Sequence, residues 1–201
     1  MSLFPQEPKK IRTRIRSYER ALRKEQEAFG AIDDSYGKRY LLGPLYLLMG
    51  DIEGALQSFA WFQETFPDDG GDPMHLLCWT LALYQSNDPD AATERLRRTM
   101  LSNLYLIPHL LGIKQETLDI WHASNLTEQA HIGYIPPEVL ALWDEPALEW
   151  LRSTYHSAEM QAIRDRYIAI YRQLKTEPRG PRRSELVEEA STLEYGEDST
   201  F

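Results

Sequence analysis

Histidines are the residues of this chain best suited to metal binding or acid–base catalysis, and their spacing decides which of these is possible. They stand at His75, His109, His122, His131 and His156. None forms an i, i+4 pair with a flanking acid, and none is linked to the single cysteine in a zinc-ligand pattern. Glu128 and His131 could place two ligands on one helical face, but a second Glu-x-x-His is missing. We therefore expect neither a metal site nor a cofactor.

The usual covalent catalysts and phosphate-binding loops are also missing from the sequence. Cys78 lies in an apolar run, which favours a buried, inert thiol, and one cysteine cannot form a disulfide within the chain. No serine sits in a glycine-flanked nucleophile turn. Gly70-Gly71 lacks the following lysine and hydroxyl residue of a phosphate loop and is typical of a linker. The sequence therefore predicts a protein that is not an enzyme.

An enzyme of unknown class remains an alternative, because folding can bring unpaired residues together. The side chains that would support it, if they shared a deep pocket, are Glu128, His131, Tyr134 and His156.

The length and net charge of the chain limit its number of domains and its classes of partner. The chain has 201 residues and a net charge of −9, so we expect one domain with a tail and no general binding of polyanions. It contains no apolar run of membrane-spanning length, and its start lacks the apolar stretch of a signal peptide. We therefore expect a cytoplasmic protein that does not contact a membrane.

Residues 36–69 carry the pattern of a helical hairpin. Large side chains at Leu42, Tyr46 and Phe59 surround two small ones, Gly43 and Ala55. Two antiparallel helices approach closely only where small side chains face each other and large ones fill the gaps beside them. Between the helices, Gly50-Asp51 supplies a residue that tolerates positive φ and one that caps the next helix, and Pro67 closes the unit.

This segment resembles the tetratricopeptide repeat, with six of eight signature positions filled as in that family. Arg39 stands where the family prefers Trp, and Phe62 where it prefers Ala, so packing on a neighbouring hairpin should be altered. A degenerate second copy follows if Asn87-Asp88 is aligned with Gly50-Asp51, at an offset of 37 residues. The resemblance covers about residues 36–106. An ordinary helical domain with a chance match is the alternative.

The resemblance implies an all-α fold in which antiparallel hairpins stack between flanking N- and C-terminal helices, as a right-handed superhelix or a closed bundle. It also implies a partner-binding groove along the first helix of each hairpin. The groove residues are apolar or aromatic: Tyr40, Leu47, Leu48, Leu77, Leu81 and Tyr84. The basic and Asn side chains with which some members clamp a terminal carboxylate are not at these positions, so that activity is not expected.

An apolar groove must be covered, by the chain's own flanking helices, by a second copy in a homodimer, or by a helix of a partner protein. We therefore predict a non-enzymatic protein–protein interaction module or scaffold.

Residues 9–28 form a basic amphipathic pattern. Ile11, Ile15, Tyr18 and Leu22 recur at helical spacing, and the first 24 residues hold eight Lys and Arg against Glu7 and Glu19. The simplest interpretation is a capping helix with its bases solvated. The alternative is a basic face that binds nucleic acid or an acidic partner, formed by Arg12, Arg16, Arg20 and Arg23. Nucleic acid is less favoured, because no interleaved aromatic set accompanies the bases.

The C-terminal part of the chain is predicted to contain one long helix and a tail. Apolar residues recur from Pro146 to Leu174 on one side of a helix over 146–174, which would complete a single domain of residues 1–176. From Ser184 to Phe201 there are six acids and no base. We expect 177–201 to be a flexible acidic tail, or to hold a short helix through Leu186, Val187 and Ala190. This tail could also fold back on the basic helix.

Overall fold

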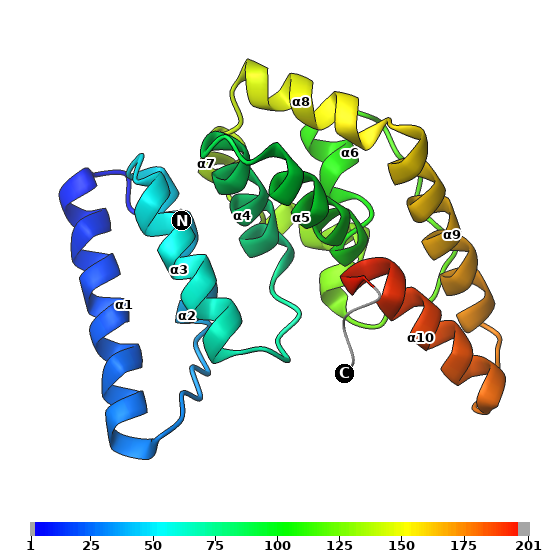
Figure 1. Cartoon of the computed structure of the whole chain (residues 1–201), viewed down its shortest axis with the longest axis horizontal. Coiled ribbons are helices and arrows are strands. Elements are labelled where there is room, and N and C mark those ends of the chain that lie inside the picture. Colours follow the sequence, from blue (N-terminus) through cyan, green and yellow to red (C-terminus); the bar gives the residue numbers. More distant parts are fainter. Residues whose placement is uncertain (1–2, 197–201) are drawn as a thin grey trace. The chain divides into compact units, whose positions relative to one another are not determined.

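The computed structural model describes residues 3–196, and in that range the regular secondary structure is helical, without strands (Figure 1). The predicted all-α class is confirmed. The α-helices are α1 (Pro8–Phe29), α2 (Lys38–Leu48), α3 (Ile52–Thr65), α4 (Pro73–Gln85), α5 (Pro89–Ser102), α6 (Leu106–Leu110), α7 (Pro137–Leu140), α8 (Glu145–Tyr155), α9 (Ala158–Leu174) and α10 (Pro181–Tyr195). Short 3-10 helices span Asn125–Thr127 and Gln129–Tyr134.

The chain divides into two compact units, which differs from the single domain predicted for residues 1–176. The first comprises the residues up to Ala92 together with Ile135–Trp143. The second comprises Thr93–Tyr134 and the residues from Asp144 onward. The boundary between the two units falls inside α5. One helix, whose apolar residues recur without a break, therefore belongs partly to each unit. Periodicity identifies helices but does not say which of them pack together.

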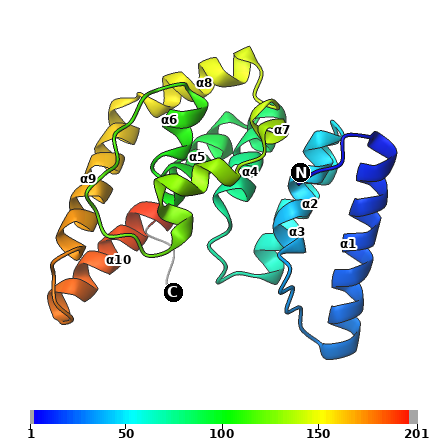
Figure 2. The ribbon, with the colours of Figure 1, turned by 180° about the vertical axis from the view of Figure 1, so that it is seen from behind.

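In the first unit, α2 and α3 form the predicted antiparallel hairpin, visible from both sides in Figures 1 and 2. Gly43 faces the ring of Phe59, and Ala55 is fully buried. Gly50 adopts a left-handed φ of 73°, and the Asp51 carboxylate accepts a hydrogen bond of 2.9 Å from the Gly54 N–H. The small residues and the turn therefore act as the sequence pattern predicted.

The turn between α4 and α5 repeats this geometry 37 residues later. Asn87 takes a left-handed φ of 63°, and Asp88 accepts a hydrogen bond of 3.1 Å from the Ala91 N–H. The backbone bonds also correspond: Gly50 N–H to Leu47 O in the first turn, Asn87 N–H to Tyr84 O in the second. Asn is one of the few residues that tolerate this backbone region. The stacking of the hairpins into a superhelix stays a prediction.

The predicted single helix over 146–174 is wrong, because two helices occupy this segment. α8 ends at Tyr155, and α9 begins at Ala158 with Ser157 as its cap, its hydroxyl accepting from the Met160 N–H at 3.2 Å. A serine that bonds the backbone of the next turn starts a helix efficiently. The apolar spacing runs on through the break, so periodicity alone could not locate it.

The acidic segment after residue 177 is helical over most of its described length, so a flexible tail is wrong for that part. α10 lies alongside α9 (Figures 1 and 2), and on α10 Leu186 and Ala190 are buried while Val187 is exposed. Arg166 and Glu189 join the two helices by hydrogen bonds of 2.5 and 2.6 Å. The helix predicted through Leu186 and Ala190 is therefore present. Residues 197–201 lie outside the described range.

Candidate functional site

The six predicted groove residues do not form an open apolar surface. Leu47, Leu77 and Leu81 are only 3%, 0% and 1% exposed, while Tyr40, Leu48 and Tyr84 are half-buried. The three leucines are therefore covered by the chain itself, which is one of the alternatives given above for this surface. The reason is visible in α4, where every residue from Pro73 to Ala82 is buried. A helix that is apolar on all sides is a core helix and has no free face.

Tyr40 takes part in a polar network at the start of α2. Its hydroxyl donates to the Asp69 carboxylate at 2.7 Å, and the Arg39 guanidinium reaches the same oxygen at 2.9 Å. Asp34, which is almost fully buried, accepts from the backbone N–H groups of Lys38 and Arg39 at 2.9 and 2.7 Å. This network ties the loop after α3 to the first turn of α2. It gives Arg39 a structural role in the first unit.

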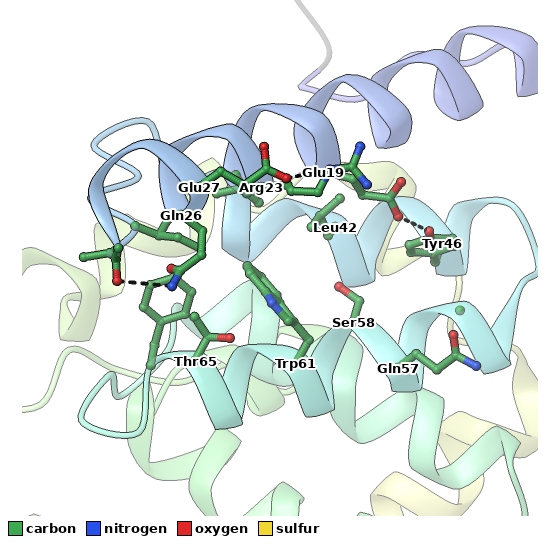
Figure 3. Close-up of a pocket in the computed structure, with 16 residues that line it drawn as sticks. Glu19, Arg23, Gln26, Glu27, Leu42, Tyr46, Gln57, Ser58, Trp61 and Thr65 are labelled. Carbon is green, nitrogen blue, oxygen red and sulfur yellow. Dashed lines mark hydrogen bonds and ion pairs between the residues drawn. The ribbon is translucent and has the colours of Figure 1, made fainter.

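A large concave site of the first unit lies elsewhere, between α1 and α3. Both helices pack on α2, which forms the floor of a trough of about 890 Å³ (Figure 3). Its lining residues are Glu19, Leu22, Arg23, Gln26, Glu27, Gly30, Ala31, Ile32, Leu42, Tyr46, Gly54, Gln57, Ser58, Trp61, Thr65 and Phe66. A volume of this size falls in the range of ligand-binding sites, about 300–1,000 Å³.

Trp61 is the central side chain of this trough. It extends from α3 toward α1 (Figure 3), and the buried Leu22 and Leu42 line the same trough. The Ser58 hydroxyl, one turn earlier on α3, is buried and has no hydrogen-bond partner among the described residues. The inner wall is therefore apolar and aromatic with one polar atom, whereas Gln57 and Gln26 stand on the rim.

One end of the trough is crossed by a hydrogen bond from the Tyr46 hydroxyl to the Glu19 carboxylate (Figure 3). Burial and the adjoining Glu19 raise the pKa of Tyr46 well above its ordinary value, so the hydroxyl keeps its proton. Beyond this bond lies a second hollow of about 320 Å³, lined by Arg12, Ile15, Arg16, Glu19, Tyr46, Met49 and Asp51. Glu19 and Tyr46 line both spaces, so this hollow adjoins the trough; it is called the basic hollow after Arg12 and Arg16, although the acids Glu19 and Asp51 also line it.

The predicted alternative basic face lies on the exposed side of α1. Ile11, Ile15 and Leu22 are buried, as expected of a helix that packs on the hairpin. The four arginines Arg12, Arg16, Arg20 and Arg23 are exposed. Arg23 is 4.0 Å from Glu27, whereas the other three form no ion pair with any described residue. Three guanidinium groups along this helix are therefore available to an anionic partner.

The residues considered for an enzyme do not assemble into either of these spaces. Glu128, Tyr134 and His156 are exposed, and none of them lines the trough or the basic hollow. Cys78 is buried, and burial raises the pKa of its thiol far above the ordinary value. Within residues 3–196 no group of three or more His, Cys, Asp or Glu side chains could hold a metal ion. Over the same residues, no helix is both long and apolar enough to cross a membrane.

Sequence reasoning missed the trough because three helices build it from unlike residue types. No sequence motif connects Leu22 on α1 with Gly54, Ser58 and Trp61 on α3. The available signal was Trp61 itself, a large aromatic residue on the side of α3 that does not contain Ala55 and Phe59. A comparison with known proteins adds no further assignment: no family model matches the chain, and no curated protein or solved structure is similar to it.

Proposed function

We propose that this chain is a non-enzymatic helical interaction module that binds a segment of another protein in the trough between α1 and α3. The observation that carries the proposal is Trp61, a half-exposed side chain that lines the trough together with the buried Leu22 and Leu42. Half-buried aromatic side chains in apolar pockets are the usual anchors of protein interfaces.

The dimensions of the trough suit a peptide segment. Its α3 wall runs from Gly54 to Thr65, which corresponds to about 16 Å along a helix. A partner helix of about three turns would cover that length. An amphipathic helix would place its apolar side chains against Trp61 and its polar ones at the rim.

Two exposed aromatic residues lie at the end of α1 and in the loop that follows it. Phe29 is 80% exposed and directly precedes Gly30 and Ala31, which line the trough. Tyr36, in the loop that leads to α2, is 86% exposed. Large aromatic side chains left in water near a pocket are typical of interaction sites. The resemblance of residues 36–106 to a family of protein-binding repeats supports the same class of function.

Site-specific photo-crosslinking tests this proposal. A benzophenone amino acid at Gln57, on the trough rim, should form a light-dependent adduct with a partner protein. The matched control is Ala60, which is exposed on the same helix but does not line the trough. Adducts from Ala60 alone, or equally from both positions, would remove the trough as the binding site. An adduct of twice the chain's own mass would identify a second copy as the partner.

The second candidate function is binding of nucleic acid or another polyanion along α1, favoured by the exposed Arg12, Arg16 and Arg20. Counterion release makes such binding fall steeply as salt is added, whereas binding in an apolar trough is nearly indifferent to salt. Titration of a labelled duplex RNA at low and high salt, with Arg12→Glu and Arg16→Glu together as the comparison, separates the two functions. Equal affinity of the double variant and the wild type would exclude the basic face.

A further inference from the structure

The trough and the basic hollow share Glu19 and Tyr46, so one extended partner can occupy both. We infer that the partner segment is an amphipathic helix with apolar anchors at one end and acidic residues at the other, the acids facing Arg12 and Arg16. This inference rests on the proposed function and names the chemistry of its partner.

The spacing along α1 defines what such a helix must carry. In Figure 3 Trp61 lies below the part of α1 that bears Arg23 and Gln26. From Arg23 the chain runs seven residues back to Arg16 and eleven to Arg12, or about 10 and 16 Å of helix. A partner helix that lies along α1 therefore needs its acidic side chains about two to three turns from its apolar anchor.

The charges at the basic hollow favour a carboxylate partner. Arg12 and Arg16 are exposed, have no ion pair with a described residue, and line the hollow from one side. The lining also holds two acids, Glu19, which accepts a hydrogen bond from Tyr46, and Asp51, which caps α3; both keep their negative charge, so a partner carboxylate must face the two arginines directly. Arg12 and Arg16 have no such bonded partner among the described residues, and each can bind a partner carboxylate that faces it.

The same arrangement disfavours a continuous polyanion. A nucleic acid that followed α1 from Arg12 toward its C-terminal end would pass Glu19 and Glu27, both exposed. Its phosphates would then meet like charges within about two turns of each favourable contact. A helix with acids at one end alone avoids this repulsion and also covers Trp61.

The test is selection from a displayed library of random peptides of about 16 residues, long enough for four turns, on the full chain. Parallel selections use Trp61→Ala, and Arg12→Glu combined with Arg16→Glu. Circular dichroism and the melting temperature establish that each variant is folded. We expect the wild type to enrich peptides with an apolar cluster and Asp or Glu about seven to eleven positions away.

We expect the wild-type peptides to bind about tenfold more weakly to the double-arginine variant, because two attractive pairs become repulsive. That variant should instead enrich peptides with Lys or Arg in place of the acids. Peptides selected on Trp61→Ala should lack the apolar cluster.

The outcomes separate the inference from the proposed function. Apolar peptides that depend on Trp61 but show no acid preference would overturn the inference and leave the trough as the binding site. Peptides that bind Trp61→Ala as well as the wild type would overturn both. Displacement of the selected peptides by duplex RNA at equal concentration would also overturn the inference, since the basic hollow would then bind phosphates.

Discussion

Gly43 of α2 packs directly under the ring of Phe59 of α3, so closely that a Cβ added to Gly43 would lie well inside van der Waals distance of the ring carbons. Phe59 is fully buried and stacks on Trp79 of α4, with ring centroids 5.2 Å apart. The ring therefore has little freedom to move away. This contact fixes the spacing of α2 and α3, and hence the floor and one wall of the trough.

Gly43→Ala should lower the free energy of unfolding of the chain by about 1–3 kcal/mol, the usual cost of overpacking a core. In an uncrowded helix interior, replacement of Gly by Ala raises the free energy of unfolding by up to about 1 kcal/mol. A decrease on Gly43→Ala would therefore indicate overpacking. Urea unfolding followed by circular dichroism measures it. Gly133→Ala is the control, because a Cβ there meets nothing within 4 Å. Equal stability of Gly43→Ala and wild type would contradict the packing described.

Asp69 gives a second prediction through its pKa. Burial alone would raise the pKa of this carboxyl, but hydrogen bonds from Tyr40, the Gly71 N–H and Arg39 outweigh it and hold the pKa below the ordinary value of 3.8. A lowered pKa means that the ionised form stabilises the fold. That stabilisation is complete above the ordinary pKa and is lost as the pH falls through the folded-state pKa.

Asp69→Asn should therefore reduce stability at neutral pH by about 1–3 kcal/mol, the cost of hydrogen bonds to a charged group. The difference from wild type should shrink as the pH falls below 3.8, where the wild-type carboxyl also loses its charge. Urea midpoints measured from neutral to acidic pH provide the check. A difference that stays constant over this range would show that ionisation of Asp69 does not contribute.

Glu194 of α10 should behave in the opposite way. Burial raises the pKa of its carboxyl, against the opposing effects of Arg98, Tyr195 and Tyr167, whose hydroxyl lies 3.4 Å away. A raised pKa means that the fold favours the protonated acid. The associated stability is present below the ordinary value of 4.5 and is lost as the pH rises through the folded-state pKa.

Glu194→Gln should therefore leave amide exchange in α10 unchanged below pH 4.5 and slow it increasingly as the pH rises through the folded-state pKa. Hydrogen exchange of peptides from Pro181–Tyr195 reports this directly. Glu189→Gln is the matched control of opposite sign, because its hydrogen bond to Arg166 lowers the pKa of Glu189. Faster exchange in both variants at high pH would contradict the sign given for Glu194.

The hairpin could be predicted from the sequence because its determinants are local. Gly50 and Asn87 are residue types that accept a left-handed backbone, and Asp51 and Asp88 follow them as caps. Turn chemistry of this kind acts within a few residues, so it can be recognised without knowledge of the tertiary structure.

The break at Ser157 and the trough could not be predicted in the same way. A serine in an apolar-periodic segment is compatible with a continuous helix, and only the bond from the Met160 N–H shows that it caps a new one. The trough depends on how far α1 stands from α3 when both pack on α2, which no local pattern encodes. For the same reason the sequence could not decide whether Leu77 and Leu81 line an open groove or belong to a core, since apolar residues suit both equally well.

The dissociation constant of the crosslinked or selected partner segment, measured by titration calorimetry for wild type and Trp61→Ala, tests the central claim most directly. Tyr134→Ala is the control, since Tyr134 is equally aromatic, 79% exposed and outside the trough. Removal of an interface anchor costs about 2 kcal/mol or more, so Trp61→Ala should weaken binding by at least about 30-fold, with Tyr134→Ala unchanged. Equal dissociation constants for wild type and a folded Trp61→Ala would contradict the assignment of the trough as the binding site.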